Sequence, residues 1–159
     1  MDAAKLSFLK DRYISSLRSI SPETKPLWGK MTFQQMVEHM ADFIKISSGK
    51  TVYTEFVTPI DKIPAYKNFI MSEKEFRENT VSPILPEAPL PVRNATIEDA
   101  MNEVEQELHY FFQVFEKDKL EQSRNPIFGD LNYDENIALL YKHALHHLKQ
   151  FGFNEKYKI

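Results

Sequence analysis

Four stretches of the 159-residue sequence carry apolar residues at spacings of three and four positions, and this periodicity is typical of helices. The predicted helices cover about residues 3–20, 33–48, 97–117 and 133–151. No stretch shows a convincing strand pattern of alternating apolar and polar residues. Each amphipathic helix has to bury its apolar stripe against a neighbour. We therefore predict an all-α fold, a four-helix bundle that forms a single domain over residues 1–159.

Capping residues place the ends of these helices. Thr32, Thr96 and Asn132 stand where N-caps are expected. Glu135 follows Asn132 by three residues, as it does in a capping box. Gly49 stands where the second helix is expected to end.

A proline-rich segment separates the two pairs of helices. Residues 49–95 hold six of the nine prolines of the chain. A structureless stretch of this length is unusual inside a compact domain. It contains enough aromatic and β-branched residues to pack, and a short helix is expected over residues 61–71. We read it as an ordered crossover that spans the bundle, so the second and third helices are expected to run parallel.

The composition narrows the class of protein. The absence of cysteine excludes disulfides, thiolate metal ligands and a cysteine nucleophile. A net charge of -3 gives no basic surface for nucleic acid, so no nucleic-acid partner is expected. No run of about 18 apolar residues is present, so no membrane span is expected. The N-terminus lacks an apolar leader, which favours a cytoplasmic protein.

Three of the five histidines lie at positions from which they can meet. His143 and His147 are one helical turn apart on the fourth predicted helix, and His39 lies on the second. At about 100° per residue, His143 and His147 fall on one flank of their apolar stripe, and His39 falls on the matching flank of its own. If these flanks face each other, three imidazoles converge. His146 is expected in solvent, and His109 lies on the wrong side of the third helix.

Three converging imidazoles are a set of metal ligands. Neutral imidazole nitrogen binds Zn²⁺ at about 2.0–2.1 Å and also suits Ni, Cu and Fe. Three protein ligands leave at least one position open for water or substrate, and a bound water would be acidified to a pKa of about 7. Each ligand histidine should donate its second N–H to a partner. Nearby candidates for these partners are Glu38, Asp42, Asn136 and Gln150.

A structural role is the alternative for these histidines, because histidine is often partly buried without a metal. No acid, base or nucleophile stands out besides them, which favours a non-catalytic binding bundle or a metal-binding sensor. Glu103 and Glu107 lie on a flank of the third helix, either as pocket carboxylates or as a solvated face. Trp28 is either a loop anchor or a wall of a pocket near the metal.

Three apolar residues fall outside the stripes of their predicted helices, namely Phe8, Leu139 and Leu145. Single exposed apolar residues are normal on a soluble surface. On a helical bundle they are also compatible with a dimer face. The sequence leaves both interpretations open.

Three segments carry a likeness to a known family: Leu27–Met40, which includes Trp28-Gly29; Asn125–Leu131, with Asn-Pro-Ile-Phe-Gly; and His143–Gly152. Together they resemble the DinB/YfiT-like superfamily, and most closely a bacterial subgroup known only as a domain of unknown function. The likeness spans nearly the whole chain and keeps the motifs in order.

The resemblance implies an up-down-down-up four-helix bundle and a homodimer. It also implies a divalent metal, commonly Ni²⁺ or Zn²⁺, held by one histidine of the second helix and a His-x-x-x-His pair of the fourth. Those positions correspond to His39, His143 and His147. Members of known activity include S-transferases and isomerases that use a low-molecular-weight thiol. On this resemblance we expect a metal-dependent hydrolase or thiol S-transferase that acts on a small molecule.

Overall fold

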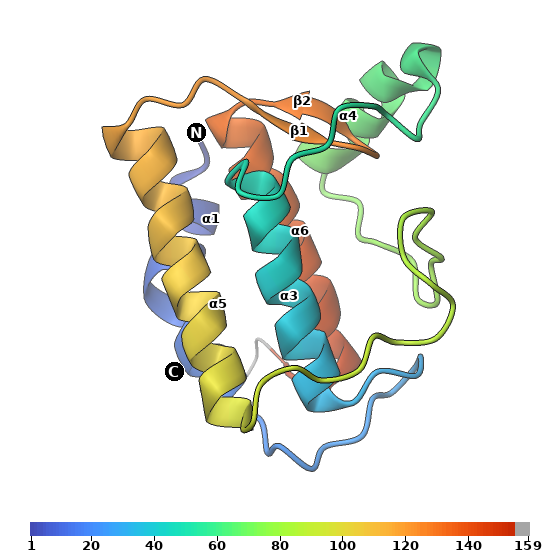
Figure 1. Cartoon of the computed structure of the whole chain (residues 1–159), viewed down its shortest axis with the longest axis vertical. Helices are drawn as coiled ribbons and strands as arrows, with labels where there is room; N and C mark the ends of the chain where they lie inside the picture. Colours follow the sequence, from blue (N-terminus) through green and yellow to red (C-terminus); the bar gives the residue numbers. More distant parts are fainter. Residues whose placement is uncertain (155–159) are drawn as a thin grey trace.

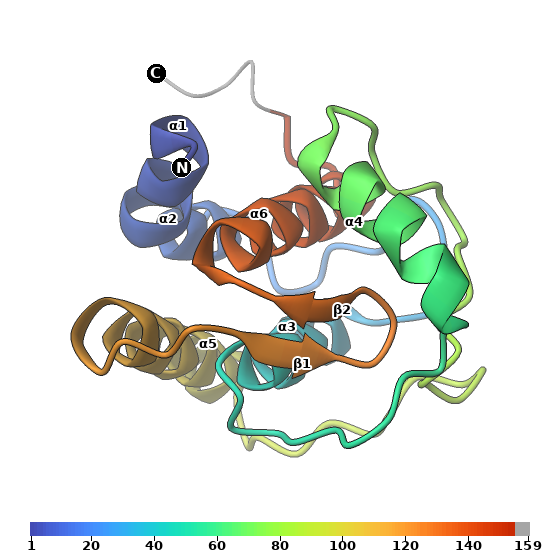
Figure 2. The same cartoon turned by 90° about the horizontal axis from the view of Figure 1, so that it is seen from above.

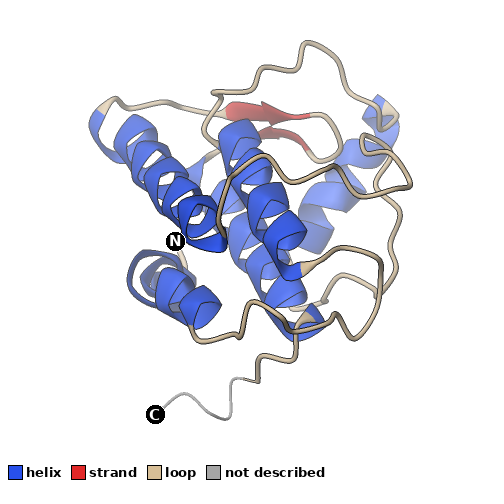
Figure 3. Ribbon diagram, turned by 60° about the horizontal axis from the view of Figure 1, so that its bottom comes forward, coloured by secondary structure: helices blue, strands red, loops and turns tan. Residues whose placement is uncertain are grey.

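The protein is predominantly helical, with a small two-stranded sheet at one end (Figure 3). The computed structural model describes residues 1–154. The elements in chain order are α1 (Ala3–Ser7), η1 (Phe8–Arg12), α2 (Tyr13–Arg18), α3 (Phe33–Ser47), η2 (Ile60–Lys62), α4 (Ile63–Met71), α5 (Ile97–Phe112), η3 (Gln113–Lys117), β1 (Ser123–Asn125), β2 (Gly129–Leu131) and α6 (Tyr133–Gln150). None of the helices in residues 1–154 has the length and apolar character needed to cross a bilayer.

The predicted N-caps are confirmed at all three long helices. At the start of α3, Thr32 Oγ1 accepts from the Gln35 backbone at 3.2 Å, and Gln35 Oε1 accepts from the Thr32 backbone at 2.9 Å. Asn132 and Glu135 form the same reciprocal pair at the start of α6. Thr96 caps α5 through the Asp99 N–H. These caps satisfy backbone donors that a helix start leaves without partners.

The long helices pack side by side around one core, with α3 against both α5 and α6 (Figure 2). Helices α3 and α5 run in the same direction and α6 runs opposite to them (Figure 1). The connection between α3 and α5 passes along the whole length of the molecule, which allows this parallel arrangement (Figure 1). Large side chains that are fully buried in the core include Phe8, Tyr13, Phe33, Met36, Met40, Ile44, Phe111 and Ile137.

The first predicted helix is divided by a π-helical turn. Residues Phe8–Arg12 form η1 between α1 and α2, and Phe8 is fully buried next to Leu9. Hydrogen bonds from i to i+5 widen the helix, so each residue turns by less than the 100° that an α-helix requires. The apolar stripe therefore shifts and takes in Phe8. The prediction that Phe8 lies outside the stripe was wrong for this reason.

The all-α prediction was also wrong in one detail, because β1 and β2 form an antiparallel hairpin. Arg124 stands opposite Asp130 in this hairpin and binds it through Nε at 2.8 Å. Asn125 Oδ1 accepts the backbone N–H groups of Ile127 and Phe128, which closes the turn. Strands of three residues are too short to show an alternating pattern, so periodicity missed them.

A second apolar cluster lies on the other side of α6. The short helix α4 and the hairpin bring Ile70, Phe128 and Leu131 against Ala138 and Leu139. Leu139 is therefore fully buried instead of lying on a surface. The predicted short helix in the crossover exists, and it covers a face of α6 that the main core leaves free.

Candidate metal centre

The structure brings together the three histidines that the sequence predicts. His39 of α3 and His143 of α6 approach with their Nε2 atoms 3.0 Å apart. His143 Nε2 and His147 Nε2, one turn apart on α6, are separated by 2.9 Å. Their ligand atoms all lie within 4.8 Å of one another. Helices α3 and α6, which carry them, pack against each other.

All three histidines are held in the neutral form. Burial lowers the pKa of His39 to about 4, against the opposing charge of Asp42. Burial also holds the pKa of His143 well below its usual value, and the neighbouring His147 and His39 add to this effect. His147 is shifted in the same direction, again mainly by burial. Since a histidine must be deprotonated to bind a metal, the cluster is ready for binding at neutral pH.

Hydrogen bonds between the rings cannot satisfy both close contacts of His143. His143 Nε2 lies within hydrogen-bonding distance of both His39 Nε2 and His147 Nε2. Each Nε2 of a neutral imidazole holds either one proton or one lone pair, so His143 Nε2 can form a linear hydrogen bond with only one of these two neighbours. A cation placed among the three nitrogens uses their lone pairs without any proton. The donor set therefore fits a divalent transition metal.

Aromatic rings orient His143. Phe43 meets its ring edge-on with centroids 4.2 Å apart, and Phe76 lies at 5.8 Å. His143 Nδ1 is buried and has no hydrogen-bond partner among residues 1–154. The orientation of the His143 ring is thus fixed by packing, whereas in most metal-binding histidines a hydrogen bond from the second ring nitrogen fixes it.

Gln150 is the predicted partner that contacts a ligand directly. His147 Nδ1 and Gln150 Oε1 are 2.7 Å apart, and both side chains are buried. Asn136 points elsewhere and donates to Ser123 Oγ and to a backbone carbonyl. Of the candidates on α6, Gln150 is therefore the one placed to orient His147.

Glu38 and Asp42 hold the crossover to α3. The buried carboxylate of Glu38 accepts the backbone N–H of Arg93 at 2.9 Å and that of Asn94 at 2.7 Å. Arg93 also pairs with Asp42 at 3.0 Å and with Glu103. Neither carboxylate of α3 thus serves as the hydrogen-bond partner that we expected for a ligand histidine. They instead fix residues 93 and 94 beside the histidine-bearing turn of α3.

The two glutamates of α5 pair with cations and stand outside the histidine cluster. Glu103 binds Arg93, and Glu107 is buried and binds Lys50 Nζ at 2.8 Å. The group of potential metal ligands found in residues 1–154 consists of the three histidines. The interpretation of Glu107 as a solvated residue was wrong, because the lysine that follows α3 covers it.

His146 is packed between two aromatic rings, so the prediction that it lies in solvent was wrong. Its ring centroid is 5.5 Å from that of Trp28 and 5.8 Å from that of Phe76. Burial lowers the pKa of His146, opposed by a hydrogen bond with the Phe76 backbone. Both aromatic residues belong to loops, whose positions helical phase cannot predict. Trp28 thus forms a wall beside the histidine cluster.

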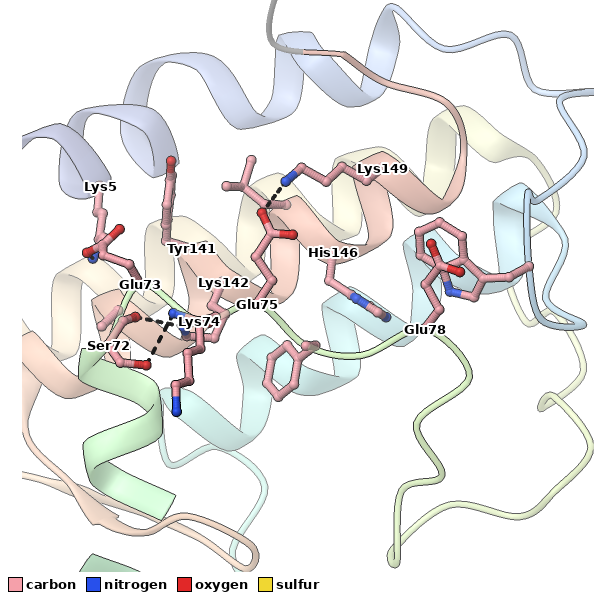
Figure 4. A pocket seen from close by; sticks show the side chains of 14 residues that line it. Lys5, Ser72, Glu73, Lys74, Glu75, Glu78, Tyr141, Lys142, His146 and Lys149 are labelled. Carbon is pink, nitrogen blue, oxygen red and sulfur yellow. Dashed lines mark hydrogen bonds and ion pairs between the residues drawn. The ribbon is translucent and has the colours of Figure 1, made fainter. Parts of the chain in front are cut away.

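A pocket of about 310 Å³ lies next to His146, on the side of α6 that faces away from α3 (Figure 4). Tyr141, Lys142 and Lys149 of α6 line it, together with residues 72–76 of the crossover. Phe76 and His146 form part of its wall, and both rings also contact ligand histidines. Phe76 and His146 therefore stand between the pocket and the histidine cluster.

Lysines of α6 hold the crossover segment that supplies Phe76. Lys142 Nζ donates to the Ser72 carbonyl at 2.8 Å and to the Lys74 carbonyl. Lys149 pairs with Glu75 (Figure 4). We call residues 72–76 the strap. Its attachment to α6 fixes the position of Phe76 against the histidines.

No family model, curated protein or solved structure matches this chain. The resemblance to the DinB/YfiT-like superfamily therefore stays a prediction from the three sequence segments. The geometry of the histidine cluster stands independently of that resemblance.

Proposed function

We propose that the protein binds one divalent transition-metal ion through the Nε2 atoms of His39, His143 and His147, and that this centre acts on a small molecule. The observation that supports the proposal is the convergence of three neutral Nε2 atoms, two of whose separations are 2.9 and 3.0 Å. Burial keeps all three rings neutral. Neutral, preorganised imidazoles are the ligands that such ions prefer.

Two of the separations between the nitrogens are close to those of imidazoles that share one ion. Two nitrogens bound at about 2.0–2.1 Å lie about 3 Å apart at a right angle and about 3.4 Å apart at a tetrahedral angle. The separations of His143 Nε2 from its two neighbours match the smaller value. The donor set suits Ni²⁺ and Zn²⁺ alike. Three protein ligands would leave at least one position open for water or substrate.

The chemistry of the proposed centre follows from its donor set. When bound, an ion of this kind acts as a Lewis acid and lowers the pKa of a water or thiol that reaches an open position. The chain itself supplies the neutral imidazoles, the aromatic walls of Trp28 and Phe76, and a pocket large enough for a small molecule. Hydrolysis or thiol transfer on such a molecule is the reaction class we propose.

Metal content of the untagged protein tests the binding proposal. We expect wild-type protein to hold about one ion per chain, measured by mass spectrometry after native expression and after reloading. His147→Ala should lose most of the ion, because it removes one of three ligands. His109→Ala is the matched control, since His109 is exposed on α5. A wild type without metal after reloading, or equal metal in His147→Ala, would contradict the proposal.

A further inference from the structure

Gln150 lies between His147 and the loop that precedes α3. Its Oε1 is 2.7 Å from His147 Nδ1, and its Nε2 is 2.9 Å from the Trp28 carbonyl oxygen. Its backbone carbonyl accepts the Leu27 N–H at 2.7 Å. The side chain is 3% exposed, so water does not compete for these contacts.

The Trp28 carbonyl decides which way the Gln150 amide faces. A carbonyl oxygen can only accept, so the amide group beside it must be the NH₂. The reversed amide would place its oxygen against the Trp28 oxygen, and two buried acceptors would face each other at 2.9 Å. With the NH₂ on Trp28, the amide oxygen faces His147 Nδ1. That ring nitrogen must then carry the proton.

We infer that Gln150 is a positioning residue that locks His147 in the tautomer protonated at Nδ1. The lone pair of His147 Nε2 then faces His143 and the centre of the cluster. The other neutral tautomer would put a proton where the metal ion has to be. The loop that precedes α3 thus sets the tautomer of His147 on α6, because its Trp28 carbonyl orients the Gln150 amide.

The loop is shaped around this amide. Gly29 has a φ of +78°, and a Cβ at that position would come within 2.9 Å of Gln150 Nε2. Two residues earlier in the same loop, the Leu27 N–H donates a hydrogen bond to the Gln150 backbone carbonyl. Three consecutive residues of the loop are therefore matched to Gln150. Leu27 donates its backbone N–H, Trp28 accepts through its backbone carbonyl, and Gly29 has no side chain that would collide with the amide.

The role of Gln150 in orienting a metal ligand rests on the proposed function, but the tautomer of His147 is measured in protein without metal. Long-range ¹⁵N–¹H spectra of metal-free protein at about pH 8 separate protonated from unprotonated ring nitrogens, well above the usual imidazole pKa of about 6.5. The His147 signals are assigned by their loss in His147→Ala. We expect Nδ1 protonated and Nε2 unprotonated. A wild-type His147 protonated at Nε2 would overturn the inference.

Two substitutions of Gln150 separate positioning from packing. Gln150→Leu keeps the volume but removes the acceptor, so the Nε2-protonated tautomer should become populated and the affinity for Ni²⁺ should fall about 10- to 100-fold. Gln150→Glu keeps an acceptor for Nδ1–H and should keep the wild-type tautomer, but it should lose stability because its second oxygen replaces the NH₂ that donates to the Trp28 carbonyl. Gln106→Leu, at an exposed position of α5, is the matched control and should change neither quantity.

The outcomes distinguish this inference from the metal proposal. An unchanged tautomer in Gln150→Leu, or the same spectrum for the Leu and Glu variants, overturns the role of Gln150 even if metal binds. The expected tautomers in a protein that takes up no metal support the role of Gln150 and defeat the proposed function. Should Gln150→Leu not fold, the wild-type spectrum and Gln150→Glu decide.

Discussion

Gly29 is the residue whose missing side chain leaves room for Gln150. We expect Gly29→Ala to lower the free energy of unfolding by about 1–2 kcal/mol, because its φ of +78° disfavours any Cβ. We also expect weaker Ni²⁺ binding, because the new methyl group would displace the Gln150 amide. Urea unfolding and metal titration measure the two effects.

Gly152 supplies the control for this substitution. Its φ is +81°, but an added Cβ meets nothing within 4 Å. Gly152→Ala should therefore lose a similar amount of stability and keep its metal affinity. Equal metal affinity in the two variants would show that the contact between residue 29 and Gln150 does not matter.

Helical phase could predict the ligand histidines because they lie on long, regular helices. Correct N-caps and a rotation of 100° per residue were enough to predict that three histidines lie on facing flanks of their helices, namely His39, His143 and His147. His146 obeys the same rule on α6, yet it is covered by Trp28 and Phe76 from loops. Gln150 was one of four candidates, and the backbone of a distant loop selected it. Helical phase predicts the direction in which a side chain points, but its neighbours depend on tertiary packing.

Among the elements, the starts of α3, α5 and α6 could be predicted from local capping residues. The hairpin and the second apolar cluster could not, because they depend on tertiary packing. Thr32 and Asn132 cap their own helices, so the signal and its effect lie within a few residues. The hairpin depends on a turn over residues 126–128 that the Asn125 side chain closes, and its strands are too short for a pattern. The burial of Leu139 depends on α4, which lies far away in sequence. Such contacts leave no periodic trace in the sequence.

The strap gives a prediction at the same scale. Lys142→Met should release the carbonyls of Ser72 and Lys74, and about 1–2 kcal/mol of stability should be lost with these charged hydrogen bonds. Amide hydrogen exchange should then become faster across residues 72–78. Phe76 would lose its fixed position against His143.

The control for the strap is Lys117→Met, at an exposed position in η3. It removes the same charge and should leave exchange in residues 72–78 unchanged. If Lys142→Met kept full protection there, other contacts would be holding the strap.

For the whole molecule, the buried histidines predict that the metal-free protein loses stability in acid. His39 stays neutral in the folded state until about pH 4, whereas an unfolded chain takes up the proton near pH 6.5. The unfolded state thus binds more protons in this window, and the free energy of unfolding falls as the pH falls through it. His39 alone should contribute a loss of about 2 kcal/mol between pH 7.5 and 5.

Urea unfolding in the presence of a chelator, at pH 7.5 and at pH 5, measures this loss. His39→Gln should show a smaller change between the two pH values, while His109→Ala should follow the wild type. A wild-type stability that is the same at both pH values would contradict the prediction.

Glu38 extends the acid sensitivity to lower pH. Burial raises its pKa, but the backbone hydrogen bonds from Asn94 and Arg93 outweigh burial and lower it overall. This carboxylate therefore stabilises the fold above its usual pKa of 4.5, and the contribution is lost as the pH falls further. The crossover should then detach from α3.

The two helices that carry the histidine cluster are far apart in the chain. His39 and His143 are 104 positions apart in the chain, and the whole crossover and α5 lie between them. Bringing such distant segments together carries a large loop-closure entropy, so nascent or partly folded chains lack the complete set of ligands. An ion held by both helices would act as a clip across that loop and would slow unfolding by favouring the closed chain. Metal uptake would thus mark the chains that have completed the fold.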